Sequence, residues 1–263
     1  MQDDGTTRPA GTAEEAFPPP GREGRKGRGR ALAALGVFGE LLITLGLVLG
    51  LFVAYSLWWT NVQADASAAH AADRLRGSWA AGPTAGPPGG SGTAPAPAAV
   101  PAIGDDVGFL HVPAMGRDFQ VLIRMGTSTA VLDEGVAGVY EQPYKSAMPW
   151  DETGNFALAA HRDGHGAKFH DLDAVQRGAA IVVETKDKWY VYKVDNTLPE
   201  TSKYDTGIVA PVPVSSGYAG PGRYITLTTC TPVYTSRYRM AVWGSLVRVD
   251  PMDAKRTPPP ELR

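Results

Sequence analysis

Residues 224–244, YITLTTCTPVYTSRYRMAVWG, decide the fold. The first part of this stretch alternates polar and apolar side chains and is rich in β-branched and aromatic residues, which is typical of a half-buried β-strand. Period two places Ile225 and Leu227 on one face of the strand and Cys230 with the polar side chains on the other. Because a free cysteine usually behaves as a small apolar residue, its place on the polar face favours a chemical role.

The surrounding residues 105–250 predict a single, mainly β domain. The expected strands are 108–112, 119–124, 155–161, 180–185, 189–196, 224–230 and 239–249, with short helices at 128–134 and around 168–174. Turn residues separate the strands, and the clearest hairpin turn is Lys186-Asp187-Lys188. Many short strands at this spacing are typical of a closed or nearly closed barrel.

A long apolar run at residues 31–60 precedes this domain. It is long enough to cross a bilayer core of about 30 Å as a helix, and Trp58 and Trp59 suit the membrane–water interface. The alternative is a cleaved signal peptide, whose apolar part is shorter and is followed by small residues. We therefore expect one retained transmembrane anchor.

Charge on either side of the anchor predicts its orientation. Five basic residues lie between positions 22 and 30, whereas residues 61–72 contain no Lys or Arg. By the positive-inside rule the N-terminus stays in the cytoplasm and everything after residue 60 lies outside the cell membrane.

The remaining segments are poor in core-forming residues. We expect a disordered basic tail at 1–30, a juxtamembrane segment and Pro/Gly/Ala-rich linker at 61–104, and a disordered tail at 251–263. The first part of 61–104, to about residue 77, has the Ala-rich composition of a helical extension. The net charge of −2 argues against nucleic acid as the partner.

Three histidines, at positions 161, 165 and 170, lie within ten residues of one another. A metal site is one interpretation, but Gly164 and Gly166 interrupt any helix that would present the histidines on one face, and the chain has no second ligand cluster. We therefore expect no metal. His161 differs from the other two because it ends an expected strand, so a rigid element positions it.

Cys230 needs a base or a cation beside it to act as a nucleophile, because the thiolate is the reactive form and an unperturbed thiol has a pKa of about 8.5. His161 is the histidine best placed to serve. Attack on an amide carbonyl also builds an oxyanion, which arginine stabilises well with its charge and fixed N–H groups. Arg237 and Arg239 share strand parity, so periodicity does not choose between them.

These residues together resemble the sortases, the cysteine transpeptidases of Gram-positive cell envelopes. The TLTTC segment ending at Cys230 and the arginine before the last strand are similar to the sortase TLxTC motif and its following arginine. Upstream, residues 154–162 resemble the GN…GHR strand with Ala160 in place of Gly, and residues 108–113 resemble the first strand. A further match, FHDL followed by Gly178, departs from the family pattern at Ala179. The resemblance covers residues 105–250, selects Arg239 over Arg237, and is greatest to the class E sortases of high-GC actinobacteria.

The resemblance implies an eight-stranded sortase-type β-barrel with short helices, preceded by one transmembrane helix. It implies cleavage of an LAxTG- or LPxTG-type sorting signal between Thr and Gly, with Cys230 as nucleophile, His161 as general acid and base, and Arg239 as oxyanion donor. Thr229 and Tyr140 are further candidates for substrate contact. The implied partners are secreted proteins that carry the signal and a peptidoglycan amine that accepts them, and no cofactor is expected.

Other classes of protein remain open from the residues alone. A non-enzymatic, membrane-tethered β-domain for surface assembly or adhesion would leave Cys230 buried and unreactive. A different envelope transpeptidase would also use Cys and His, but the L,D-transpeptidases carry an S-x-G-C context that is absent here. A papain-like protease requires a helix at the cysteine, and a metal-dependent hydrolase would be sensitive to chelators.

Overall fold

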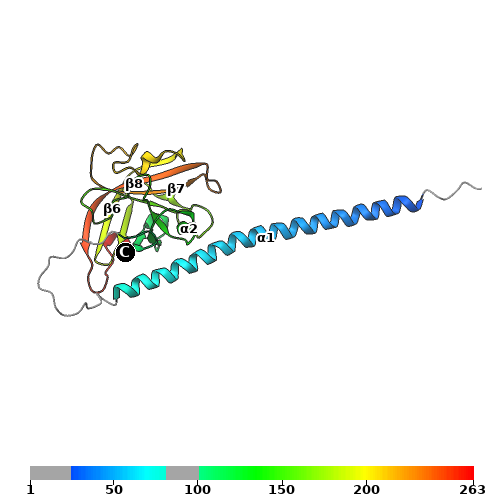
Figure 1. Ribbon diagram of the computed structural model, residues 1–263, viewed down its shortest axis with the longest axis horizontal. Helices are drawn as coiled ribbons and strands as arrows, with labels where there is room; N and C mark the ends of the chain where they lie inside the picture. The colour runs from blue at the N-terminus through cyan, green and yellow to red at the C-terminus, as the bar shows by residue number, and fades with distance from the viewer. Residues whose placement is uncertain (1–24, 81–100) are drawn as a thin grey trace, which may run out of the picture. The chain divides into compact units, whose positions relative to one another are not determined.

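The computed structural model describes residues 25–80 and 101–263 of the chain (Figure 1). The chain divides into two units, residues 1–53 and 54–263. The helix α1, Arg25–Ala80, contributes to both units. Most of the expected N-terminal tail, residues 1–24, and most of the expected linker, residues 81–100, lie outside the described residues.

In the first unit, α1 exposes its apolar side chains, including Leu41, Leu45 and Phe52. Among the described residues, α1 from Leu32 onward is the one helix long and apolar enough to cross a membrane. The expected anchor at 31–60 lies within it. The helix does not end there, and its continuation to Ala80 agrees with the helical extension expected after residue 60.

Eight strands of the second unit form a closed barrel, which confirms the predicted fold class. Their order around the barrel is β1-β2-β3-β4-β7-β8-β6-β5. The strands are β1 (Asp106–His111), β2 (Gln120–Met125), β3 (Ala137–Val139), β4 (Gly154–Ala159), β5 (Ala180–Glu184), β6 (Lys188–Ser202), β7 (Arg223–Thr231) and β8 (Tyr238–Pro251). Figure 1 shows the long strands β6, β7 and β8 in one part of the wall, where β8 pairs with both of the others.

Two strand pairs, β2–β3 and β4–β7, are parallel, and the other pairs are antiparallel. The β4–β7 register runs from Gly154 opposite Arg223 to Ala159 opposite Thr228. Because parallel strands end at the same edge of a sheet, the chain segments that follow β4 and β7 emerge side by side.

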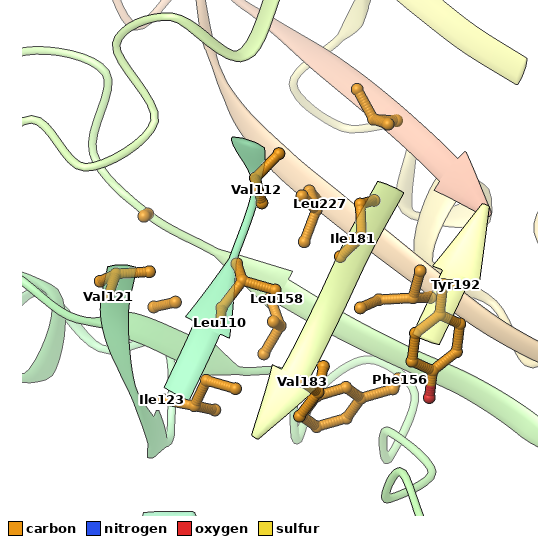
Figure 2. Close-up of a cluster of buried hydrophobic side chains, with 14 of the residues drawn as sticks. Leu110, Val112, Val121, Ile123, Phe156, Leu158, Ile181, Val183, Tyr192 and Leu227 are labelled. Carbon is orange, nitrogen blue, oxygen red and sulfur yellow. The ribbon is translucent and has the colours of Figure 1, made fainter. Parts of the chain in front are cut away.

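Alternate side chains of these strands fill the barrel interior. Figure 2 shows apolar side chains from β1, β2, β4, β5, β6 and β7 meeting there. Leu110, Leu158, Ile181 and Leu227 have no exposed surface. Leu227 shares its face of β7 with the buried Ile225, so the predicted parity of β7 is confirmed.

Some expected elements differ in extent. β3 was not expected, because three residues are too few to show a period. The strand expected at 155–161 ends at Ala159, and β6 continues to Ser202, beyond the expected residue 196. The helix expected at 128–134 is present as α2, Thr129–Leu132, whereas the one expected at 168–174 is only a 3₁₀ turn, η2, Leu172–Ala174.

The C-terminal segment 251–263, expected to be a disordered tail, instead packs on the barrel. Arg248 on β8 forms an ion pair with Glu261 at 2.7 Å, and Leu262 packs against a buried cluster that contains Val182 and Trp189. A short 3₁₀ turn, η4, Pro260–Leu262, carries both contacts. Proline-rich composition indicated disorder, but several side chains with partners on the barrel, including Arg256 and Met252, hold the segment.

Candidate active site

Cys230 lies near the end of β7, where its side chain is half-buried and its thiol is free. Its direct partner across the antiparallel β7–β8 pair is Arg239. Residues directly opposite each other in such a pair lie on the same face, with Cβ atoms about 5 Å apart. The pairing therefore places the Arg239 side chain on the same face of the sheet as Cys230, as its neighbour across the strands.

The two candidate arginines differ in position. Arg239 lies in β8, and its Nη1 donates to the carbonyl oxygens of Tyr238 at 2.9 Å and Ser236 at 3.2 Å. Arg237 precedes the strand, and its guanidinium lies over the ring of Tyr238 at 5.1 Å from the ring centre. The structure therefore pairs Arg239, and not Arg237, with Cys230.

The last paired positions of β4 and β7 are Ala159 and Thr228. His161 lies two residues after the first and Cys230 two residues after the second. Continuing the parallel register places the two at the same level. The carbonyl oxygen of His161 accepts a hydrogen bond from the Phe169 N–H at 2.9 Å, which closes the loop that follows the strand. His161 was expected inside the strand, and it stands instead at the start of this loop.

A cavity of about 630 Å³ opens between these segments. Cys230 and His161 both line it, together with Arg162, Asp163 and Tyr234. The cavity is therefore bounded by the β4 end, the loop after it, the β7–β8 connection and, from α1, Ser56 and Thr60. A sulfur and an imidazole that share one cavity wall are the groups that nucleophilic attack on a carbonyl requires.

Tyr140 follows β3 and lies on the same side of the barrel. Its hydroxyl is 3.0 Å from Oγ1 of Thr228, which shares the β7 face of Cys230. Burial raises the pKa of Tyr140 above its ordinary value, and the hydrogen bond to Thr228 and the charge of Arg239 oppose this in part. The phenol therefore stays protonated at neutral pH. The Thr228 hydroxyl donates its own proton to the Leu158 carbonyl oxygen at 3.2 Å, so the phenol donates to Thr228 and its oxygen can still accept a hydrogen bond.

Thr229 faces the other way. Adjacent strand residues point to opposite faces, and the Thr229 side chain is buried, with 3% of its surface exposed. Its hydroxyl donates to the carbonyl oxygen of Ala160 at 2.8 Å. Thr229 thus ties β7 to the segment that leads to His161, and this orientation does not support the expected substrate contact.

Sequence reasoning missed two residues that contact this site. Asp133, just after α2, has its Oδ1 2.8 Å from Nε2 of His161 and 3.6 Å from Nδ1 of His165. Arg162 is buried, donates to Oγ1 of Thr231 at 3.2 Å and pairs with Asp173 at 3.0 Å. A basic residue after the histidine was visible in the sequence as part of the GN…GHR-like strand, but no local pattern marks Asp133.

The site combines a strand cysteine, an arginine opposite it and a histidine at the neighbouring strand end, on a closed eight-stranded barrel. The Sortase domain family matches residues 110–247, which include all of these groups. The chain belongs to the sortase family and is a cysteine transpeptidase.

Within the family, the chain is similar to class E sortases. It is 55% identical to Sortase SrtE2 of Streptomyces coelicolor over 92% of this chain and 94% of that protein. Sortase SrtE1 of the same organism is 45% identical over 85% of this chain and 60% of that protein. The crystal structure of Sortase E1 from Streptomyces coelicolor with a tripeptide in the active site aligns with a TM-score of 0.57 and 44% identity, covering 62% of this chain and all of that one.

Proposed function

We propose that this protein is a membrane-anchored, extracellular sortase that cleaves an LAxTG- or LPxTG-type sorting signal between Thr and Gly. The observation that carries the proposal is the placement of Cys230 opposite Arg239 and on one cavity wall with His161. The relative whose structure holds a tripeptide in its active site supports a peptide substrate for this cavity.

In the first half of the reaction, Cys230 attacks as the thiolate at the carbonyl carbon of the signal's threonine. The carbonyl π electrons move to oxygen, and Arg239 donates hydrogen bonds to the oxyanion that forms. His161, in its protonated form, gives a proton to the glycine nitrogen as the C–N bond breaks. The products are a thioester on Cys230 and a free peptide amine.

In the second half, an amine attacks the thioester carbon. His161, now neutral, takes the proton from the attacking nitrogen, and the thiolate of Cys230 leaves. The new amide joins the protein to the amine donor. We propose a peptidoglycan amine as donor and secreted, signal-bearing proteins as substrates.

Substrate contacts are proposed for Tyr140 on the basis of its place beside Thr228, Cys230 and Arg239. The contact first expected for Thr229 stays a prediction, and its buried hydroxyl favours a supporting role instead. No cofactor or metal takes part in the proposed reaction.

Membrane attachment is proposed through the apolar part of α1, with the N-terminus in the cytoplasm. The length of the apolar helix and the basic residues that precede it support this orientation. The catalytic unit then lies outside, where cell-wall amines and secreted proteins meet.

The test is transfer by the full chain in detergent micelles. We expect the wild-type protein to join LAxTG peptides, and LPxTG peptides less well, to an added amine such as triglycine, with cleavage between Thr and Gly seen by mass spectrometry. Cys230→Ala should abolish both cleavage and the thioester adduct, because no other group supplies the sulfur. Unchanged turnover in Cys230→Ala would rule the mechanism out.

A further inference from the structure

The His161–Asp133 contact joins two segments that the strand framework does not itself hold together. Asp133 follows α2 and precedes β3, whereas His161 begins the loop after β4. Both side chains are about one-third exposed or less, so as an ion pair the contact contributes little to folding. Its position is more informative, because Oδ1 of Asp133 lies 2.8 Å from Nε2 of the histidine proposed to move protons.

A carboxylate that accepts from Nε2 fixes the proton on that nitrogen. The other ring nitrogen, Nδ1, is then left for proton transfer, and the ring is held against rotation. His165 reinforces the arrangement, since its ring lies 5.3 Å from that of His161 and its Nδ1 is 3.6 Å from the same carboxylate oxygen. Asp133 thus holds the orientation of the His161 ring through Nε2.

The part of α1 within the second unit contacts both segments. Ala64 is buried, with 3% of its surface exposed, against the turn after Asp133, and a Cβ placed on Gly135 would lie 3.1 Å from the Ala64 carbonyl oxygen. One turn of helix therefore lies directly on the segment that carries Asp133. A cavity of about 230 Å³ between them is lined by Ala64, Asp133 and His165.

The same turn of α1 also binds the histidine loop. Oδ1 of Asn61 accepts the Gly166 N–H at 2.9 Å, and Oδ1 of Asp65 lies 2.6 Å from Nζ of Lys168. A Cβ on Gly166 would lie 2.9 Å from the Asp65 carboxylate, so the approach is close as well as polar. Asn61, Ala64 and Asp65 thus contact both segments that meet at the Asp133–His161 pair.

Further contacts keep this part of α1 on the barrel. Ala71 has 1% of its surface exposed and packs with Phe109 and Leu122. Trp79 meets the Phe109 ring edge-on, with ring centres 5.5 Å apart. The turn at Asn61–Asp65 is therefore part of an extended interface and not an isolated contact.

We propose that Asp133 is a positioning residue for His161, and that the juxtamembrane turn Asn61–Asp65 of α1 holds the two segments in register. The helix that follows the anchor is then part of the catalytic apparatus and not a passive spacer. This inference rests on the proposed role of His161 in transpeptidation.

The first test compares Asp133→Asn with Asp171→Asn in the full chain in micelles. Asp171 is an exposed carboxylate of the same histidine loop that makes no cap hydrogen bond, so it controls for the loss of charge. We expect Asp133→Asn to lower kcat by about tenfold or more with KM within about twofold, because a misplaced proton donor slows chemistry without changing substrate binding. Asp171→Asn should match wild type, and a kcat for Asp133→Asn within twofold of wild type would overturn the positioning role.

The second test displaces the helix with Ala64→Arg and uses Ala66→Arg, on the exposed side of the same turn, as the matched control. Hydrogen exchange should rise at residues 133–135 and 161–170 only in Ala64→Arg, and kcat should fall with it. Faster exchange with unchanged kcat, or no change in exchange, would contradict the proposal. Exchange needs no substrate, so it tests the helix contact even if the wild-type chain transfers no peptide, an outcome that would count against the proposed function alone.

Discussion

Two polar sites on the outside of the same barrel are built from similar groups and differ in what is left unsatisfied. One contains Cys230 with a histidine and an arginine, and the half-buried Cys230 lines a cavity of about 630 Å³. The other contains Glu184, the last residue of β5, with 2% of its surface exposed. An ionisable side chain with basic neighbours, such as Glu184, is therefore not by itself evidence of an active site.

The Glu184 carboxylate is fully engaged. Its partners are Arg256 at 2.9 Å on one oxygen, and His111 at 3.0 Å and Arg76 at 3.5 Å on the other. Burial alone would raise its pKa, but the hydrogen bonds from His111 and Arg256 and the charge of Arg76 lower the pKa of Glu184 below its ordinary value. These partners come from α1, β1 and the C-terminal segment, so this site fastens chain segments together, whereas the Cys230 site keeps its sulfur available.

The largest expected effect comes from removing the arginine that lies opposite Cys230. Arg239→Ala should lower kcat/KM by about 10²–10³-fold, the usual loss for one oxyanion donor, with no change in the urea midpoint. Arg237→Ala is the matched control, because Arg237 precedes β8 and is not paired with Cys230. Transfer kinetics on an LAxTG peptide measure both, and equal losses in the two variants would remove the distinction between them.

The next largest effect is expected at the Glu184 site, where a substitution should lower stability and leave activity unchanged. Glu184→Gln should lower the free energy of unfolding at pH 7 by about 2 kcal/mol, because it removes hydrogen bonds between charged groups, while kcat/KM stays within about twofold of wild type. Glu200→Gln, an exposed carboxylate on β6, is the control.

The pH dependence of that loss has a definite sign. A carboxylate whose pKa is lower in the folded state stabilises the fold above its unfolded pKa, near 4.5, and loses that contribution as the pH falls through the folded pKa. Urea unfolding at a series of pH values should therefore show wild type and Glu184→Gln converging below about pH 4.5. A constant difference down to pH 3 would contradict the ionised role of Glu184.

The sequence predicted one of these sites and not the other for physical reasons. Period two in residues 224–230 separates Cys230 from the core residue Leu227, and this local pattern survives in the structure. Glu184 lies at the end of a predicted strand, but each of its three partners is 72 or more residues away in the sequence. No local sequence pattern indicates such contacts. Asp133 was invisible for the same reason.

Predictions from composition were less accurate than predictions from hydrophobic periodicity. The Pro-rich end of the chain was expected to be disordered, yet Glu261 and Leu262 find partners on the barrel. β3 escaped notice because three residues carry no period, although it lies between β2 and β4 and is needed to close the barrel. Periodicity thus located the barrel strands, whereas contacts formed by one or two side chains required the three-dimensional structure.

The smallest expected effect is on substrate binding at the Cys230 site. Tyr140→Phe removes a hydroxyl that lies 3.0 Å from Oγ1 of Thr228, on the Cys230 face of β7. If the phenol oxygen also accepts a hydrogen bond from an N–H of the bound signal, KM for the peptide should rise by about three- to tenfold, as expected for one neutral hydrogen bond of about 1 kcal/mol, with kcat nearly unchanged. Tyr144→Phe, more exposed in the same loop, should leave both constants unchanged. A Tyr140→Phe enzyme with normal KM but a lowered unfolding midpoint would instead show that Tyr140 stabilises the fold, as Glu184 does, and does not bind substrate.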